Sequence, residues 1–306
     1  MPPAIRVRDV RKRYGSLQAV DGVSFAVDRG ETFGILGPNG AGKTTTLEMV
    51  EGLTRPDAGE LEILGEPVWP RPERVQRRIG VQLQQTALFD YLTATELLEL
   101  FGRFYGPVPR GHVQGLLDTV GLSEKGGARV ITLSGGQKQR LAIALALVHE
   151  PDVVFLDEPT TGLDPQARRN LWDVIRAIGA EGRTVVLTTH YLEEAEELCR
   201  RVAIMDEGRI VALDTPAGLV RSLGPRARVR FRAGDLPAPA VASLPAVESA
   251  SEHDGVTVLV STDPQATLLA LVRVAEQHGE RLEDLSVERG TLEDVFLALT
   301  GREFRE

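Results

Sequence analysis

One eight-residue segment constrains the fold of this chain more than any other. Residues 37–44 read Gly-Pro-Asn-Gly-Ala-Gly-Lys-Thr, which fits the pattern GxxxxGK[ST]. An apolar run at 33–36 precedes the segment, and residues 44–50 can continue it as a helix. A glycine-rich turn between a strand and a helix lets backbone amides point at a phosphate group at the helix N-terminus. The segment therefore predicts a nucleotide-binding α/β domain.

The residues of this loop have separate expected roles. The Lys43 ammonium should bridge the β- and γ-phosphates, the Thr44 hydroxyl should bind Mg²⁺, and the Thr45 hydroxyl should contact the α-phosphate. A chance match in a glycine-rich chain (31 Gly in 306 residues) is the alternative, and the flanking strand and helix argue against it. The expected nucleotide-binding set is Gly37, Pro38, Asn39, Gly40, Ala41, Gly42, Lys43, Thr44 and Thr45.

Two more segments follow in order along the chain. Residues 133–137 read Leu-Ser-Gly-Gly-Gln, and residues 153–158 read Val-Val-Phe-Leu-Asp-Glu. Because Asp157 ends an apolar run, its carboxylate should emerge at the carboxyl end of a buried strand, where α/β sheets bind ligands. Asp157 is therefore the expected Mg²⁺ ligand. Glu158 is the candidate carboxylate that polarises the attacking water, since phosphoryl transfer needs positioning more than covalent chemistry.

Bulk composition limits the class of protein. A length of 306 residues suits one large domain and one small domain. A net charge of −9 argues against nucleic acid as the main partner, because phosphate binding favours a basic surface. The longest aliphatic run, residues 141–148, is too short to span a membrane, and the N-terminus lacks the apolar core of a signal peptide. We therefore expect a cytoplasmic chain whose membrane function, if any, depends on another polypeptide.

Residues 1–222 read as an alternation of strands and helices. Aliphatic runs at 32–36, 153–156 and 184–187 are typical of buried parallel strands. Residues 5–28 and 60–64 suit an antiparallel edge, and Asp164-Pro165 should cap a helix that runs through residue 178. Between residues 84 and 134 the strand pattern stops, and Thr93 with Glu96 forms a capping box. The prediction is a mainly parallel sheet with an antiparallel edge and an inserted helical subdomain, at about 85–150.

The tail, residues 223–306, has a different composition. Glycine and proline are frequent at 224–245, and the elements expected after this point are β, α, β, β, α and β. They lie around residues 229–231, 240–244, 247–251, 256–260, 264–278 and 282–288. A last helix should begin at Thr291, with Asp294 three residues later. The tail is thus predicted to be a small α+β accessory domain.

With all three motifs in view, residues 5 to about 220 resemble the ABC ATPases. The Leu-Ser-Gly-Gly-Gln between the other two motifs is the signature of that family. In the family it caps the nucleotide of the opposite subunit, so the resemblance implies a homodimer, or a heterodimer of two ATPases, with ATP at the interface. It assigns Ser134, Gly135, Gly136 and Gln137 to the partner's nucleotide and Asp164 to the D-loop that crosses the dimer. Ser134 is also the expected N-cap of the helix that follows.

The resemblance assigns three more residues. Gln84 matches the Q-loop glutamine, which reaches Mg²⁺ and the catalytic water and links the site to a membrane partner; Gln82 and Gln85 are the alternatives. His190, at the end of the run 185–190, matches the switch histidine, whose imidazole contacts the γ-phosphate. Tyr14 matches the aromatic residue that stacks on adenine. The expected catalytic set is therefore Glu158, His190 and Gln84, and the expected metal set is Thr44, Gln84 and Asp157.

Two classes of ABC protein remain as hypotheses. The first is the ATPase subunit of a membrane transporter, and the second is a soluble ABC ATPase that acts on the ribosome or on DNA. The chain has one cassette, whereas soluble translation-type members have two. Only about 90 residues without heptads separate the first two motifs, too few for the coiled coil of DNA-repair members. The helical insert should instead dock on a permease, with Leu88, Phe89 and Tyr91 as candidate contacts or, alternatively, as subdomain core.

The tail favours one transporter group. Residues 290–303 read Gly-Thr-Leu-Glu-Asp-Val-Phe-Leu-Ala-Leu-Thr-Gly-Arg-Glu, which resembles the C-terminal signature of daunorubicin-resistance ATPases. That group pairs with separate ABC-2 type permeases, mostly for export. The resemblance therefore implies an Mg-ATP-hydrolysing subunit at the inner face of the cell membrane that powers export of a hydrophobic compound, with no nucleic-acid partner.

Overall fold

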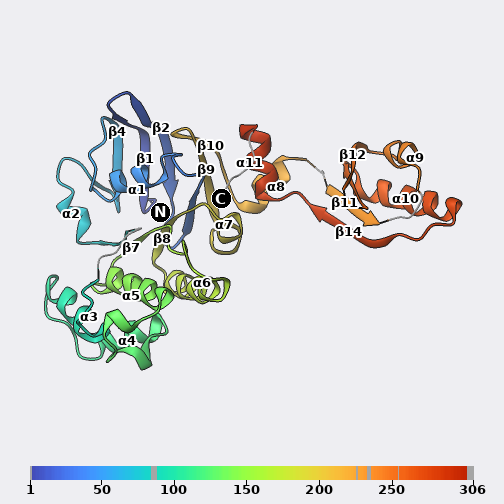
Figure 1. Cartoon of the computed structure of the whole chain (residues 1–306). Coiled ribbons are helices and arrows are strands. Elements are labelled where there is room, and N and C mark those ends of the chain that lie inside the picture. Colours follow the sequence, from blue (N-terminus) through green and yellow to red (C-terminus); the bar gives the residue numbers. More distant parts are fainter. Residues whose placement is uncertain (1, 84–87, 225–226, 233–235, 254, 302–306) are drawn as a thin grey trace. The chain divides into compact units, whose positions relative to one another are not determined.

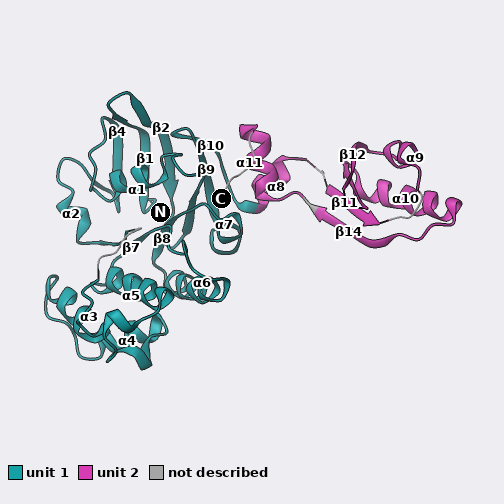
Figure 2. Cartoon of the chain, in the orientation of Figure 1, with its two compact units in different colours: residues 1–216, 305–306 teal, residues 217–304 magenta. Residues whose placement is uncertain are grey.

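The computed structural model describes residues 2–83, 88–224, 227–232, 236–253 and 255–301. The chain divides into two compact units, Met1–Pro216 and Ala217–Phe304 (Figure 2). The boundary at Pro216 lies a few residues before the position expected from the sequence, residue 222, so that nearly all of helix α8 (Pro216–Ser222) belongs to the second unit. Within the described ranges, no helix is both long and apolar enough to cross a membrane.

A six-stranded sheet forms the centre of the first unit. Its strand order is β10-β9-β3-β8-β7-β6, and all neighbours are parallel except β10, which is antiparallel to β9. Every residue of β7 and β8 is buried, which explains why these strands read as unbroken aliphatic runs. The strands are β3 (Thr32–Leu36), β6 (Ile79–Gln82), β7 (Val153–Asp157), β8 (Thr184–Thr189), β9 (Arg201–Asp206) and β10 (Arg209–Asp214).

The N-terminal strands form a second sheet of their own. The order is β2-β1-β4-β5, and all pairs are antiparallel. Residues 5–28 and 60–64 were expected to form an antiparallel edge, and β1, β2 and β4 do pair antiparallel, in a sheet of their own; the antiparallel edge strand of the parallel sheet is β10. The two sheets share one buried core, in which Phe25 and Phe33 stack with ring centroids 5.3 Å apart. The strands are β1 (Ile5–Tyr14), β2 (Leu17–Val27), β4 (Ala58–Ile63) and β5 (Glu66–Pro67).

The helices of the first unit fall into two groups. Helices α1 (Lys43–Val50), α2 (Glu73–Gln76), α6 (Pro165–Ala180) and α7 (Leu192–Leu198) lie in the α/β core. Helices α3 (Ala94–Arg103), α4 (His112–Thr119) and α5 (Gly135–Leu147), with short 3₁₀ turns at Ser123–Lys125 and Val130–Thr132, pack on one another as the helical subdomain (Figure 1). The structure confirms the predicted capping box at the start of α3.

That capping box is reciprocal: the Glu96 amide donates to the Thr93 hydroxyl, and the Thr93 amide donates to the Glu96 carboxylate.

Helix α5 of the subdomain lies very close to strand β6 of the parallel sheet. A side chain at Gly80 would place its first carbon 2.0 Å from the Ala146 carbonyl oxygen, so glycine alone lets β6 approach α5 this closely.

The second unit has the order of elements predicted for the tail. Its sheet, β12-β13-β11-β14, is antiparallel throughout, and its core forms between the sheet, α9 and α10. The elements are β11 (Ala227–Arg232), α9 (Ala238–Ala242), β12 (Val247–His253), β13 (Val256–Ser261), α10 (Pro264–His278), β14 (Glu283–Arg289) and α11 (Leu292–Thr300).

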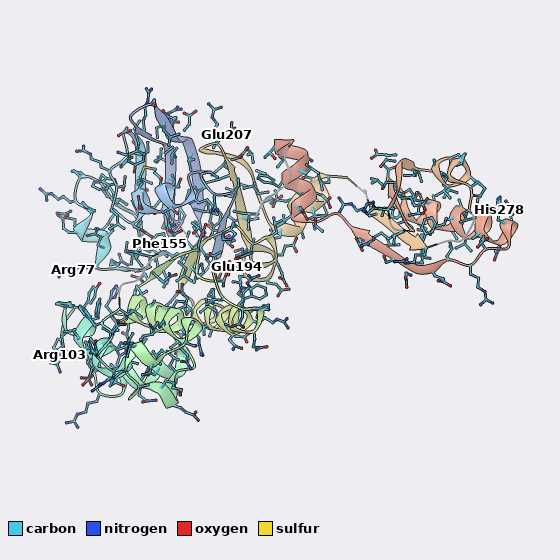
Figure 3. All side chains as sticks on the ribbon, viewed as in Figure 1. Arg77, Arg103, Phe155, Glu194, Glu207 and His278 are labelled. Atoms are coloured by element: carbon cyan, nitrogen blue, oxygen red, sulfur yellow. The ribbon has the colours of Figure 1, made fainter. Side chains whose placement is uncertain are left out.

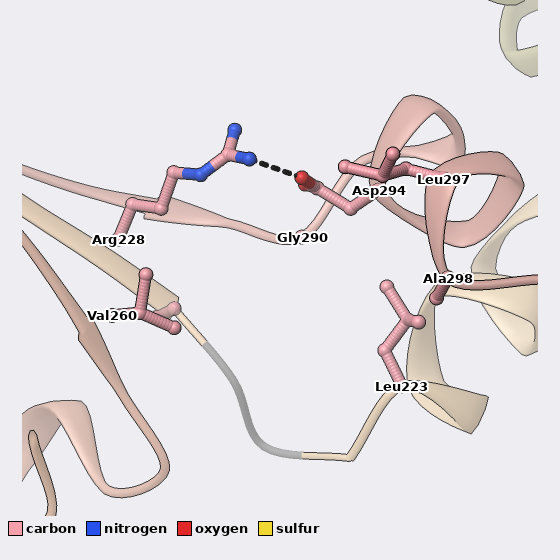
Figure 4. Close-up of a pocket in the computed structure, with 8 residues that line it drawn as sticks. Leu223, Arg228, Val260, Gly290, Asp294, Leu297 and Ala298 are labelled. Carbon is pink, nitrogen blue, oxygen red and sulfur yellow. Dashed lines mark hydrogen bonds and ion pairs between the residues drawn. The ribbon is translucent and has the colours of Figure 1, made fainter. Parts of the chain in front are cut away.

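The last helix is tied to the sheet of the second unit by one carboxylate. Asp294 accepts hydrogen bonds from the amide and hydroxyl of Thr291, which are part of a capping box at the start of α11. The same side chain pairs with the Arg228 guanidinium on β11 (Figure 4). Beside this ion pair lies a pocket of about 210 Å³, whose apolar wall includes Leu223, Val260 and Leu297.

Candidate active site

The glycine-rich segment 37–42 forms a tight loop between β3 and α1. Gly40 and Gly42 have φ angles of 84° and 97°, in the left-handed region where a side chain is strained. A carbon side chain on Gly42 would also lie 2.4 Å from the Ala19 carbonyl oxygen. Lys43, only 4% exposed, curls back over the loop, and its Nζ donates to the carbonyls of Gly37 (2.8 Å) and Pro38 (3.2 Å). The ammonium is thus held inside the turn where a phosphate would bind.

Glu158 joins this lysine to a histidine that is far away in the sequence. Lys43 Nζ lies 3.2 Å from Glu158 Oε1, and His190 Nδ1 lies 3.2 Å from Glu158 Oε2. Glu158 has a φ of 47°, and its amide donates to the Thr188 hydroxyl (3.0 Å), which fixes this unusual backbone. Burial alone would raise the pKa of Glu158, but the charges of Lys43 and His190 and their hydrogen bonds bring it below its ordinary value. Glu158 is therefore an ionised carboxylate at neutral pH.

A second pair of oxygen donors lies beside this cluster. The Thr44 hydroxyl is 3.3 Å from Asp157 Oδ1, and the Thr188 hydroxyl also donates to that oxygen. Burial raises the pKa of Asp157 above its ordinary value, while the hydrogen bonds from Thr188 and Thr44 oppose the shift. A hydroxyl and a carboxylate side by side are the hard oxygen donors that Mg²⁺ prefers. The chemistry of this donor set therefore fits the expected metal.

Lys43, Thr44 and Glu158 line one cavity of about 530 Å³, and Asp157 and His190 contact this cavity wall through Thr44 and Glu158. Tyr14, which is 47% exposed, and Glu158 are both part of its wall. Most of the loop residues predicted to contact the nucleotide also line it: Asn39, Gly40, Gly42, Lys43, Thr44 and Thr45. Ala41 is buried, and Gly37 and Pro38 act through their carbonyls on Lys43. The volume and the lining chemistry suit a nucleoside triphosphate.

Two segments of the cavity wall were missed by sequence reasoning. One is Leu17–Ala19 at the start of β2, and the other is Glu207-Gly208 in the turn between β9 and β10. Both turn residues have positive φ, as in a two-residue hairpin turn, and the Gly208 amide donates to the Ala41 carbonyl at 3.0 Å. The Glu-Gly pair between two apolar runs was a usable hairpin signal. Its nearness to the phosphate loop could not be read from the sequence, because that depends on β9 pairing with β3.

The signature residues and Asp164 lie together, away from this cavity. Ser134 caps α5 in a reciprocal capping box with Gln137, as predicted for the N-cap, and Gly135 is exposed. Asp164 caps α6 by accepting from the amides of Gln166 and Ala167. The two helix N-termini adjoin, since a side-chain carbon on Gly136 would lie 3.1 Å from Ala167 Cβ. Among the residues that the structure describes, the nucleotide cavity of a single chain contains neither segment, and Gln84 lies outside the described residues.

The sequence has extensive similarity to known transport proteins. A family model described as ABC transporter matches residues 20–161. Nod factor export ATP-binding protein I of Ralstonia nicotianae is 42% identical, with 99% of this chain and 96% of that protein covered. Daunorubicin resistance ATP-binding protein DrrA3 of Streptomyces coeruleorubidus is also 42% identical, with 99% of this chain and 97% of that protein covered.

Solved structures match about the length of the first unit. The protein cbiO1 from Clostridium perfringens, part of the ABC transporter complex cbiONQ, has a TM-score of 0.66 and 28% identity over 73% of this chain and 95% of its own. A dimeric ATP-binding cassette in a post-hydrolysis state, bound to ADP and Pi, has a TM-score of 0.63 and 28% identity over 69% of this chain and 98% of its own. With 42% identity to ATP-binding proteins over nearly its whole length, this chain belongs to the ABC transporter family and is one of its ATP-hydrolysing subunits.

Proposed function

We propose that two copies of this chain, or one copy and a related ATPase, hydrolyse Mg-ATP at their interface and drive a separate ABC-2 type permease that exports a hydrophobic compound. The observation that carries the proposal is the contact of Glu158 with both Lys43 and His190, next to the Thr44–Asp157 pair, at a cavity that Lys43, Thr44 and Glu158 line. These side chains supply the charge and the hydrogen-bonding groups that positioning of a triphosphate requires.

Each side chain has a distinct role in the proposed reaction. Lys43 exchanges its contact with Glu158 for the β- and γ-phosphates, and Thr45 contacts the α-phosphate. Glu158, released from Lys43, accepts a hydrogen bond from the attacking water, while His190 donates to the γ-phosphate and orients Glu158. Tyr14 stacks on the base. Thr44 and Asp157, with Gln84, would hold Mg²⁺, which neutralises charge on the phosphate oxygens.

The remaining predicted residues act on the partner's nucleotide. Ser134, Gly135, Gly136 and Gln137 would approach the γ-phosphate of the opposite subunit, and Asp164 would cross the interface. The exposed amino end of α5 supports this role, because helix N-termini favour anions. A dimeric state of a solved ABC cassette with 28% identity supports the same arrangement.

The names of the relatives support export. Both are described as export or drug-resistance ATP-binding proteins, which favours the transporter hypothesis over a soluble ATPase acting on ribosomes or DNA. On the helical subdomain, Phe89 and Tyr91 are 56% and 77% exposed, so they suit docking on a permease better than a core role. The chain would then lie at the inner face of the cell membrane.

Two variants test the ATPase site. Glu158→Gln should form an ATP-dependent dimer in size-exclusion chromatography and hydrolyse ATP far more slowly, whereas Lys43→Ala should lose ATP binding. Glu181→Gln, in an exposed pair with Arg183, is the matched control and should behave as wild type. A Glu158→Gln variant that stays monomeric and hydrolyses ATP normally would remove Glu158 from the mechanism.

The membrane partner needs a separate experiment. The tagged chain, purified from gently solubilised native membranes, should bring down a polytopic permease. Recovery of ribosomal proteins instead would favour the soluble-ATPase hypothesis.

A further inference from the structure

A carboxylate with no solvent exposure lies on α7, shortly after His190 in the chain, and has no role in the mechanism above. Glu194 is on α7, four positions after His190, and its exposed fraction is 0% (Figure 3). Its Oε1 accepts from the Trp172 indole nitrogen on α6 at 3.2 Å, and its Oε2 accepts from the Thr160 hydroxyl at 3.2 Å. A buried carboxylate is costly unless several donors surround it. Its contacts therefore indicate which segments it holds together.

The electrostatic surroundings of Glu194 agree with this geometry. Burial raises its pKa above the ordinary value, while hydrogen bonds from Thr189, Thr160 and Trp172 and the charge of Arg168 oppose the shift. The Arg168 guanidinium also lies over the Tyr191 ring, 4.0 Å from its centroid. Helix α6, helix α7 and the end of β8 thus meet around one side chain.

Each contacted segment carries a residue of the proposed site. Thr160 lies in the loop that connects Glu158 to Asp164. Trp172 belongs to α6, the helix that Asp164 caps. Thr189 and Tyr191 flank His190. One buried carboxylate therefore joins the segment that contacts the nucleotide in this subunit to the segment that is proposed to contact the other subunit.

We propose that Glu194 is a positioning residue that makes the His190 segment and the Asp164 loop move as one body, so that the state of the γ-phosphate at one site is transmitted to the partner's site. The inference rests on the proposed dimeric function. Without Glu194, each site would still bind ATP through Lys43, but closure of the two sites would no longer be coupled. Glu194 itself is fully buried and is not part of the described wall of the nucleotide cavity.

The test compares Glu194→Ala with Glu193→Gln, an exposed neighbour on the same helix, in the full chain. We expect Glu194→Ala to keep its Kd for ATP within about twofold of wild type and to lose about 10- to 100-fold in kcat, because misplaced catalytic groups have effects of this size. Its Hill coefficient for ATP hydrolysis should fall to about 1 from a higher wild-type value. Glu194→Gln, which keeps one acceptor oxygen, should lie between Ala and wild type.

A second variant changes the same contact with less disturbance of the buried packing, so that a loss of activity is not simply due to unfolding. Trp172→Phe removes one donor to Glu194 and keeps the aromatic packing, so it should lower the Hill coefficient without changing the Kd for ATP. If the variants lower kcat and ATP affinity together and leave the Hill coefficient unchanged, Glu194 has a structural role only. A wild-type Hill coefficient of about 1 also overturns the inference, since no coupling would remain to transmit. Failure of the wild type to bind or hydrolyse ATP would instead refute the proposed function.

Discussion

Exchange of Glu158 for Gln should tighten the binding of ATP to a single subunit, apart from its effect on hydrolysis. In the structure, Lys43 contacts two loop carbonyls and the Glu158 carboxylate, the latter at 3.2 Å. A triphosphate must replace that carboxylate before it can use the ammonium. Removal of the negative charge frees Lys43 and also removes a repulsion between Glu158 and the γ-phosphate.

The structure sets the size of this effect. The side chains of Lys43 and Glu158 are only 4% and 6% exposed, so solvent screens the pair weakly. Coulomb's law at an effective dielectric constant of about 20 gives roughly 5 kcal/mol at this separation, which is an upper limit because nucleotide binding restores a partner to Lys43. Hydrogen bonds to charged groups contribute about 1.5–3 kcal/mol net, and this range corresponds to about 10- to 150-fold in affinity.

The assay is calorimetric titration with a non-hydrolysable ATP analogue and Mg²⁺. The protein concentration should be low enough for light scattering to show monomers in both proteins, because dimer closure would also tighten binding. Glu181→Gln makes the same chemical change in an exposed pair with Arg183 and should leave affinity unchanged. An affinity of Glu158→Gln equal to or weaker than wild type would refute the idea that Glu158 competes with the triphosphate for Lys43.

Three further perturbations have defined outcomes. Glu51 is 2% exposed, and burial, with the charge of Asp157, raises its pKa from 4.5 to about 8. The folded chain thus keeps a proton on Glu51 that the unfolded chain releases. The contribution of this proton to the free energy of unfolding is fully present below about pH 4.5 and is lost as the pH rises to about 8. Glu51→Gln should therefore raise the melting temperature at about pH 8 and flatten its pH dependence in scanning calorimetry; an unchanged pH profile would show that Glu51 is ionised in the fold. Gly42→Ala should abolish ATP binding in titration calorimetry, because the added carbon would lie 2.4 Å from the Ala19 carbonyl; wild-type affinity would contradict the loop geometry. Tyr14→Ala should weaken ATP binding by about 1–3 kcal/mol through lost stacking, and Tyr14→Phe should retain it; equal losses in the two would point to the hydroxyl instead.

Elements controlled by neighbouring residues were predicted well from the sequence. The last helix begins next to Thr291, where it was expected, and Asp164-Pro165 opens α6 as expected. The alternation of Val229 and Phe231 with arginines marks β11 correctly. Caps and alternation depend on residues within a few positions of each other, so a single sequence contains the necessary information.

Strand partners were less accessible to prediction. Residues 5–28 and 60–64 were expected to form an antiparallel edge, and they are antiparallel strands; that β1 pairs with both β2 and β4, over forty residues away, in a sheet separate from the parallel one, was not predicted. Antiparallel alternation indicates that one face is buried and does not say which strand lies alongside.

The sequence by itself determined the chemistry of this protein: a phosphate loop with Lys43 and Thr44, an acidic pair at the end of a buried strand, and a signature for a second subunit. Only the tertiary structure decided that Glu158 bridges Lys43 and His190, that Glu207 and Gly208 line the cavity, and that Glu194 accepts from both Thr160 and Trp172. The reason is the strand order β9-β3-β8-β7, which brings to one sheet edge residues that are more than a hundred positions apart. Motifs are local patterns, whereas contacts between them depend on long-range pairing and packing in the folded chain.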